Sequence, residues 1–234
     1  MSELCDLPAV QARSLMGARK LSPVELVDSC IGRIESIDHA VNSFCANSFQ
    51  AAREQAKQSE TSIARGDTIG PLHGLPLGVK DLIDAKGLPT TYGSPLFAGN
   101  VATKDEAIVG MLRRAGAIVI GKTNVPKWGA GGNTRNALHG ATGNPFDPTK
   151  SAAGSSGGSA VALATGMVAP RHRFGHRRFG PQSRWLLRRR WVPPIARTDC
   201  QRQPRHGLAA DLSTRPYGAL RRRSLPDVVV QARL

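Results

Sequence analysis

The spacing of apolar residues in the first two thirds of the chain predicts three helices. Apolar side chains recur at helical spacing over 22–38, where Ser22 and Glu25 have the arrangement of a capping box around a proline. A more polar helix is expected over 51–65, and an amphipathic one over 105–115. A glycine follows each of the last two segments, as is common at the end of a helix.

Two short apolar runs, 74–81 and 117–120, are typical of buried strands. Lys80 stands near the end of the first run, and Gly121 ends the second. Strands that alternate with helices predict an α/β layered domain. Between 128 and 158 the chain is rich in Gly, Asn and Ser, a loop length that is uncommon in a compact domain unless the loop has a function.

The net charge of +15 is concentrated at one end of the chain. Residues 1–170 contain 16 Lys and Arg against 14 Asp and Glu, whereas residues 171–234 contain 16 Arg, no Lys and only three acidic residues. A basic protein of this kind invites a nucleic-acid hypothesis. That hypothesis stays open as an alternative, with a steep salt dependence of binding as its mark. The uneven distribution of charge argues against it.

The arginine-rich segment has the composition expected of a GC-rich gene read out of frame. The codons for residues 171–183, read one base later, permit the sequence x-T-G-S-D-T-G-G-S-V-R-N-P. Each shifted position has few options, so a coherent match of this length is hard to obtain by accident. We therefore divide the chain into a domain at 1–170 and an out-of-frame tail at 171–234, which we expect to be disordered.

The N-terminus gives no indication of export, and the cysteines give none of metal binding. The N-terminus lacks a basic region followed by an apolar one, and no apolar run reaches a membrane-spanning length. The cysteines lack CxxC or Cys/His ligand spacing; they are Cys5, Cys30, Cys45 and Cys200. We expect a cytoplasmic protein with reduced thiols, no metal and no membrane partner.

The stretch 151–159, Ser-Ala-Ala-Gly-Ser-Ser-Gly-Gly-Ser, predicts a tight loop that enters a buried helix. Glycines let the backbone approach a ligand closely, and the first turn of a helix presents free N–H groups. A loop that only caps a helix would look the same, so the spacing to other motifs decides between the two interpretations.

Four motifs occur in the order and at the spacing of the amidase signature family. They are Gly78-Val79-Lys80-Asp81, Gly121-Lys122-Thr123-Asn124, Asn144-Pro145 and Gly154-Ser155-Ser156-Gly157-Gly158-Ser159. The resemblance covers about residues 5–170, and the shifted reading adds the family's next element, G-S-D-T-G-G-S-x-R. It implies a partial α/β/α sandwich, incomplete because the C-terminal half is absent.

The resemblance also implies a chemistry, the hydrolysis of carboxamides by a Ser–cis-Ser–Lys triad without a cofactor. Lys80 resembles the catalytic lysine, and Ser155 resembles the bridging serine that follows a cis peptide bond. The nucleophilic serine would fall where Phe179 is written, so the chain as written is expected to be inactive. Loop-supporting roles are implied for Ser156, Gly157, Gly158 and Ser159.

This triad is chemically coherent because a serine hydroxyl is a poor nucleophile until a base removes its proton. A lysine can act as that base only when desolvation keeps it neutral. Without the resemblance, Lys80 would be interpreted as a surface lysine that closes a strand. Lys122 is expected to be structural or substrate-facing, since the full P-loop spacing is missing. His73 and His139 are expected to be loop histidines.

Within the family, the A subunit of tRNA-dependent amidotransferases is the alternative. That subunit typically carries Met-Asp-Glu-Phe-Ala-Met after the Gly-Lys-Thr-Asn motif, whereas this chain has Val-Pro-Lys-Trp-Gly-Ala-Gly-Gly at 125–132. The departure favours a stand-alone amidase with a small-molecule amide substrate. A homodimer stays open as its oligomeric state. A minimal amidase that uses Ser156 as its nucleophile is a further alternative.

Overall fold

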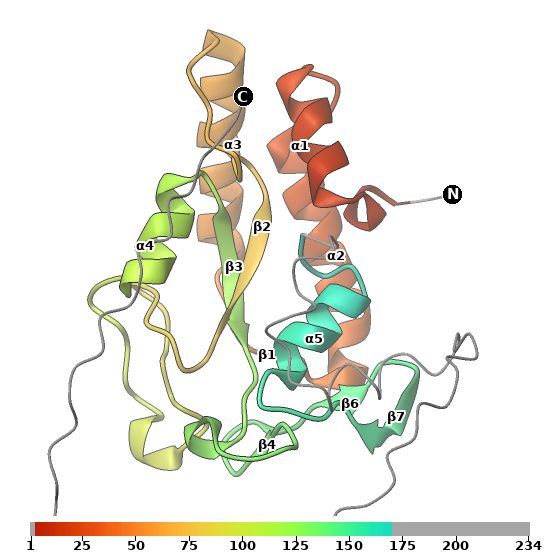
Figure 1. Ribbon diagram of the computed structural model, residues 1–234, viewed down its shortest axis with the longest axis vertical. Coiled ribbons are helices and arrows are strands. Elements are labelled where there is room, and N and C mark those ends of the chain that lie inside the picture. Colours follow the sequence, from red (N-terminus) through yellow and green to blue (C-terminus); the bar gives the residue numbers. More distant parts are fainter. Residues whose placement is uncertain (1–2, 170–234) are drawn as a thin grey trace, which may run out of the picture. The chain divides into compact units, whose positions relative to one another are not determined.

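The structure, a computed structural model, describes residues 3–169. Its main sheet has three strands in the order β1-β3-β2, with helices on both faces (Figure 1). The expected α/β class is confirmed. The elements are η1 (Leu4–Asp6), α1 (Ala9–Gly17), α2 (Pro23–Val41), β1 (Phe44–Asn47), α3 (Phe49–Arg65), β2 (Pro76–Lys80), η2 (Pro95–Phe97), α4 (Ala107–Arg114), β3 (Ile118–Thr123), η3 (Lys127–Gly129), β4 (Arg135–Asn136), β5 (Gly140–Ala141), β6 (Gly143–Asn144), β7 (Asp147–Ser151) and α5 (Gly157–Ala164).

The three helices predicted from apolar spacing all form. At the start of α2, Ser22 Oγ accepts from Val24 N at 2.9 Å, and the Glu25 carboxylate accepts from Ser22 N at 3.0 Å. This reciprocal capping box satisfies two N–H groups that have no partner inside the helix. The helix runs on to Val41, three residues beyond the predicted end, and stops where Asn42 takes the left-handed conformation with φ 51°.

The sheet is mixed, with β1 antiparallel and β2 parallel to β3. A register shift separates Leu77 from Gly78, so that Val79 lies opposite Lys122 and Lys80 lies opposite Thr123. Because successive side chains in a strand point to opposite faces, Lys80 and Lys122 are directed to different sides of the sheet.

Two apolar clusters cover these faces. The larger one joins α2 and α5 to the sheet through residues such as Leu26, Val161 and Ile120. The smaller one lies on the other face, where Val109 of α4 packs with Val79. Figure 1 shows α4 on one side of the sheet, with α2 and α5 on the other. The carboxyl end of β2 therefore lies between two layers of helix.

The structure corrects the sequence interpretation at three places. The strand predicted over 117–120 does not end at Gly121 but continues to Thr123, because Gly121–Thr123 pair with the last residues of β2. Neither α1 nor β1 was predicted. The long loop over 128–158 contains two small antiparallel ladders, β4–β5 and β6–β7.

Gly158 lets the start of α5 pack directly against the backbone at the ends of β1 and β3. A Cβ on this residue would lie 2.5 Å from both Ser43 O and Asn124 N. Real Cβ atoms essentially never approach other atoms this closely. The two backbone atoms concerned are bonded to each other, since Asn124 N donates to Ser43 O at 2.9 Å. The glycine therefore sets the distance between α5 and the sheet.

Replacing Gly158 with alanine is expected to destabilise the domain by about 1–3 kcal/mol, because the methyl group forces the helix away from the strands. Urea unfolding followed by circular dichroism measures this change. Gly32→Ala is the matched control, since Gly32 lies within α2 with open space around it and should become more stable by up to about 1 kcal/mol. Equal stability changes in the two variants would contradict the packing described here.

Candidate active site

The carboxyl end of β2 brings Lys80 to the loop that precedes α5. Lys80 Nζ lies 3.0 Å from Ser155 Oγ, although the two residues are 75 positions apart in sequence. The peptide bond between Gly154 and Ser155 is cis. The two residues for which the resemblance implies catalytic roles thus meet in space.

The remaining predicted residues of this loop surround the start of α5. Ser159 Oγ lies 2.6 Å from Thr123 Oγ1, which links the first turn of the helix to the end of β3. Gly157 N donates to Thr134 Oγ1 at 2.9 Å, and a Cβ on Gly157 would lie 2.3 Å from that oxygen. Ser156 precedes the helix, and its side chain makes no capping hydrogen bond.

Lys80 is half-buried beside a cavity of about 250 Å³. Apart from Lys80, every side chain that lines the cavity is apolar or carries a hydroxyl, and the apolar ones include Leu77, Ile108 and Ala162. Burial in this setting lowers the pKa of Lys80 from its ordinary value, because the charged amine loses water that apolar neighbours cannot replace.

A lysine in this state can exchange a proton with the serine that it contacts. The neutral amine has a lone pair that accepts a proton, and the Ser155 hydroxyl can both donate and accept hydrogen bonds. The pair can therefore pass a proton from a third group to Lys80.

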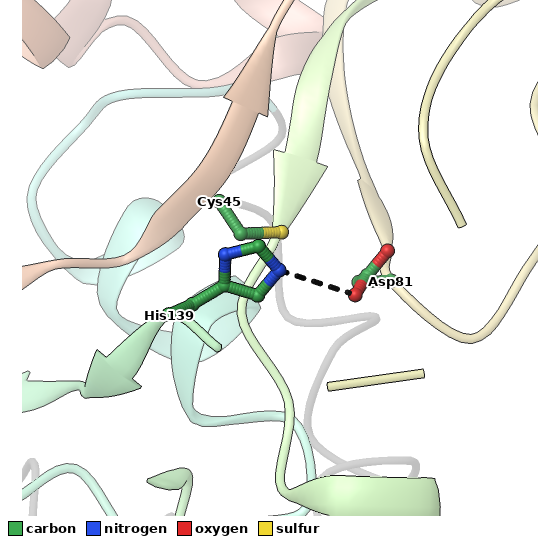
Figure 2. Close-up of side chains that lie close together, drawn as sticks. All are labelled: Cys45, Asp81 and His139. Atoms are coloured by element: carbon green, nitrogen blue, oxygen red, sulfur yellow. Dashed lines mark ion pairs between the residues drawn. The ribbon is translucent and has the colours of Figure 1, made fainter. Parts of the chain in front are cut away.

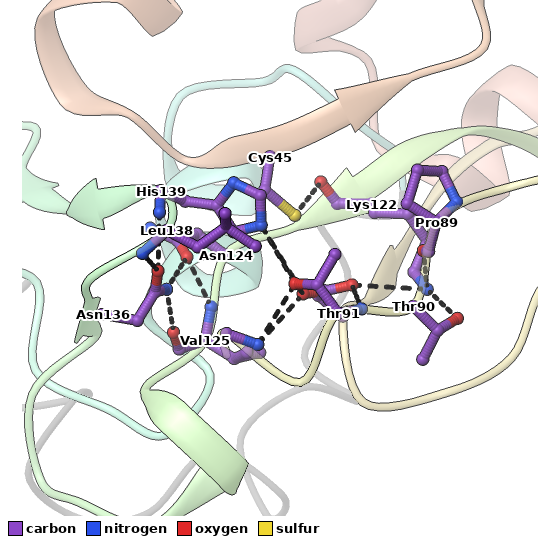
Figure 3. Close-up of polar contacts among 12 residues, drawn as sticks. Cys45, Pro89, Thr90, Thr91, Lys122, Asn124, Val125, Asn136, Leu138 and His139 are labelled. Carbon is purple, nitrogen blue, oxygen red and sulfur yellow. Dashed lines mark hydrogen bonds and ion pairs between the residues drawn. The ribbon is translucent and has the colours of Figure 1, made fainter. Parts of the chain in front are cut away.

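A second polar cluster lies beyond the end of β2, around Asp81. The Asp81 carboxylate accepts from Thr91 N at 2.9 Å and from Thr91 Oγ1 at 2.5 Å. Thr91 Oγ1 in turn lies 3.0 Å from His139 Nε2, and Lys122 Nζ lies 3.8 Å from the carboxylate (Figure 3). Asn124 extends the network, since its side chain oxygen accepts from Asn136 at 2.8 Å.

Cys45, Asp81 and His139 point toward one another within this network, with their ligand-type atoms all within 4.8 Å (Figure 2). Asp81 and His139 already have Thr91 as a hydrogen-bond partner, and the Lys122 amine lies close to the same carboxylate. Burial raises the pKa of the Cys45 thiol to about 12, with a further contribution from Asp81. The Cys45 thiol donates to Lys122 O at 3.4 Å. Because hydrogen bonding thus accounts for all three side chains, we assign no metal here.

Some of these residues were singled out from the sequence and others were not. Lys122 was expected to be structural or substrate-facing, and its complete burial agrees with the structural alternative. His139 was interpreted as a loop histidine; it lies between β4 and β5 but also contacts Thr91. Asp81 and Thr91 were missed. The signal that could have found them is a charged residue directly after a buried strand, since buried carboxylates need hydrogen-bond partners.

Comparison with known proteins gives this geometry a family. The family model described as Amidase matches residues 25–170, more than half of the chain. The chain belongs to the amidase family.

The relatives of this amidase-family chain include both amidotransferases and amidases. It is 35% identical over 164 residues to the A subunit of the glutamyl-tRNA(Gln) amidotransferase of Streptomyces coelicolor, a match that covers 70% of this chain and 33% of the relative. A bacterial aryl acylamidase of the amidase signature family superposes with a TM-score of 0.66 and 32% identity, over 69% of this chain and 34% of that one. The peptide amidase from Stenotrophomonas maltophilia superposes with a TM-score of 0.65 and 31% identity, over 70% of this chain and 35% of that one.

The chain spans about a third of the length of the curated relatives that it matches. The segment 171–234, for which the sequence predicts an out-of-frame tail, lies outside the described residues, as do Phe179 and Cys200. Among residues 3–169, no helix is both long enough and apolar enough to cross a membrane.

The segment 125–132, which is expected from the sequence to separate this chain from amidotransferase A subunits, packs beside the segment that follows Lys80. Trp128 N donates to Tyr92 O at 2.7 Å. The Trp128 ring stacks on Tyr92 with centroids 5.6 Å apart and meets Phe97 edge-on at 5.2 Å, yet 48% of Trp128 stays exposed. Trp128, Tyr92 and Phe97 thus form an aromatic cluster that is partly exposed.

The raised pKa of Cys45 predicts that this thiol resists alkylation. At pH 8.5 we expect iodoacetamide to modify Cys45 at least about a hundredfold more slowly in the native chain than in urea, because only the thiolate reacts. Mass spectrometry of the peptide that carries Cys45 measures the rate, and the unfolded chain is the control. Equal rates in the two states would show that the network around Asp81 is open to solvent.

Proposed function

We propose that this chain derives from an amidase that hydrolyses carboxamides to a carboxylate and ammonia or an amine, with Lys80 as general base and Ser155 as proton relay. The observation that carries the proposal is the 3.0 Å contact between a half-buried lysine amine and a serine hydroxyl. Burial lowers the pKa of Lys80, which favours the neutral amine that a base must be. Membership of the amidase family supports the substrate class.

The proton path in this proposal needs a third hydroxyl. Lys80 takes a proton from Ser155, and Ser155 takes one from the nucleophilic serine as that oxygen bonds to the amide carbon. The proton returns to the leaving nitrogen when the carbon–nitrogen bond breaks, and water then releases the acyl group by the same route. In the one-base-shifted reading this nucleophile falls where Phe179 is written.

The chain as written therefore lacks the group that attacks the substrate. Members of a catalytic triad act as a unit, so the loss of the nucleophile leaves only residual catalysis. Ser156 is a weaker candidate for this role, because the contact of Lys80 is with Ser155. A small-molecule amide as substrate, a cytoplasmic location and a possible homodimer complete the proposal.

A second candidate function is that of the amide-hydrolysing component of a tRNA-dependent amidotransferase. The similarity to A subunits of glutamyl-tRNA(Gln) amidotransferases, at 35–37% identity, favours it. The sequence at 125–132 and the exposed Trp128 that it carries speak for the stand-alone enzyme. Binding of nucleic acid by the arginine-rich segment is less favoured, because the charges of residues 1–170 nearly balance.

Restoring the reading frame tests the proposal. The DNA around codon 170, read one base later, should encode the Asp-Thr-Gly-Gly-Ser loop and continue well beyond codon 234. The protein expressed from the restored frame is expected to release ammonia or amine from simple carboxamides. The 234-residue chain is expected to show no measurable release, because it lacks both the nucleophile and the glycine-rich loop whose N–H groups would stabilise the oxyanion.

Two outcomes would contradict this account. Early stop codons in both alternative frames would remove the basis for a shifted reading. Amide hydrolysis by the 234-residue chain itself, at a rate similar to that of the restored protein, would mean that another nucleophile operates. Release that depends on a charged tRNA and on a partner protein would instead favour the amidotransferase.

A further inference from the structure

A fully buried lysine, Lys122, lies on the sheet face opposite Lys80. Its Nζ contacts Pro89 O at 2.8 Å and Thr90 Oγ1 at 2.9 Å (Figure 3). It also contacts Ile83 O at 2.9 Å. An ammonium group has three N–H donors for these three oxygens, whereas a neutral amine has only two. Burial lowers the pKa of Lys122, and the Asp81 carboxylate acts in the opposite direction. Because three acceptors and a carboxylate surround the amine, we take the charged form as the one that this arrangement favours.

The buried carboxylate of Asp81 balances this charge. It lies 3.8 Å from Lys122 Nζ and accepts from Thr91 and from Gly93 N, the latter at 3.3 Å. Removing one partner of a buried ion pair leaves an uncompensated charge, which is strongly unfavourable. Asp81 and Lys122 thus depend on each other.

These contacts fix the chain directly after Lys80. Ile83 N donates to Lys80 O at 3.0 Å, and Asp81 N donates to Thr123 O at 3.0 Å. The turn that Lys122 holds through Ile83 is therefore the same turn that is bonded to the backbone of Lys80. A shift of this turn would move the amine relative to Ser155.

We propose that Lys122 is a positioning residue for Lys80: it holds the turn after β2 and balances the Asp81 carboxylate, so that Lys80 remains neutral and directed at Ser155. The inference rests on the proposed function, in which Lys80 is the base. It adds a buried ion pair on the opposite face of the sheet as the device that keeps the base in its working state.

The charges around Lys80 determine in which direction its protonation should change when Lys122 is replaced. On its own side, the cavity offers only apolar and hydroxyl groups. With Lys122 charged, the pair on the other face has no net charge; without it, the carboxylate would stabilise protonated Lys80. Burial is the cause of the lowered pKa of Lys80. The other titratable groups near the pair are Cys45, Asp84 and His139.

Competitive acetylation of the native 234-residue chain with acetic anhydride tests the proposal. Only neutral amines react, so the labelling rate of the peptide that carries Lys80, followed by mass spectrometry across pH, reports the protonation of Lys80. In Lys122→Met the pH midpoint should move up, and labelling at pH 7 should slow about tenfold. Lys104→Met, at an exposed lysine, is the matched control and should leave the profile unchanged.

Asp81→Asn separates the charge from mere structural damage. This variant keeps the ammonium and removes the carboxylate, so the Lys80 midpoint should move down, because the uncompensated positive charge disfavours protonated Lys80. Structural damage would expose Lys80 to water in either variant and move both midpoints up. The double variant Asp81→Asn/Lys122→Met should regain most of the labelling rate lost in Lys122→Met. Circular dichroism shows which variants fold. If Lys122→Met does not fold, the midpoint of Lys80 in Asp81→Asn tests the charge balance instead.

The outcomes distinguish this inference from the function on which it rests. An ordinary midpoint for Lys80 in the unsubstituted chain would contradict its role as a neutral base. A low midpoint there that does not change in Lys122→Met would overturn only the positioning role. An unchanged or higher midpoint in Asp81→Asn, or a double variant as slow as Lys122→Met, would overturn the charge balance.

Discussion

Proton transfer from Ser155 to Lys80 depends on a lysine amine that has lost much of its water. A lysine in bulk solvent is protonated at neutral pH and cannot accept a proton from a hydroxyl. Here β2 ends between two helical layers, and an apolar cavity adjoins the side chain. The resulting burial lowers the pKa of Lys80, and this one constraint makes the rest of the proposed chemistry possible.

The close packing of α5 holds Ser155 where this amine can reach it. Gly157 and Gly158 face Thr134 and the backbone at Ser43, with no room for a side chain at either position. The helix start therefore lies directly against the strand ends. The loop before it lies beside the end of β2, where Ser155 contacts Lys80. The glycines of the sequence motif thus serve a packing requirement as well as a chemical one.

Much of the fold could be predicted where the signal was local. The helix α2 was identified because its capping box and apolar spacing lie within one segment. β1 was missed because its four residues form a strand only by pairing with β3, more than 70 positions away in sequence. The end of β3 was placed too early because Lys122 looks like a surface residue; only its partners at 83–90 explain how a lysine can be buried there.

The site, too, combines residues that a motif identifies with contacts that only the folded chain brings about. The meeting of Lys80 with Ser155 was expected from the resemblance to a family, not from spacing, because no local pattern joins residues that far apart. The pair formed by Asp81 and Lys122 was missed for a related reason. Each residue belongs to a recognised motif, but the attraction between them arises only when two parallel strands align.

The most direct test of the account is the effect of Ser155→Ala and Lys80→Ala on kcat/KM in the protein expressed from the restored frame. We expect each change to lower kcat/KM by about 10²–10⁴-fold or more, and the parent activity to rise with pH as Lys80 loses its proton. Ser36→Ala and Lys104→Ala, at exposed positions, are the matched controls. A Ser155→Ala enzyme with unchanged kcat/KM would contradict the role given to the contact between Lys80 and Ser155.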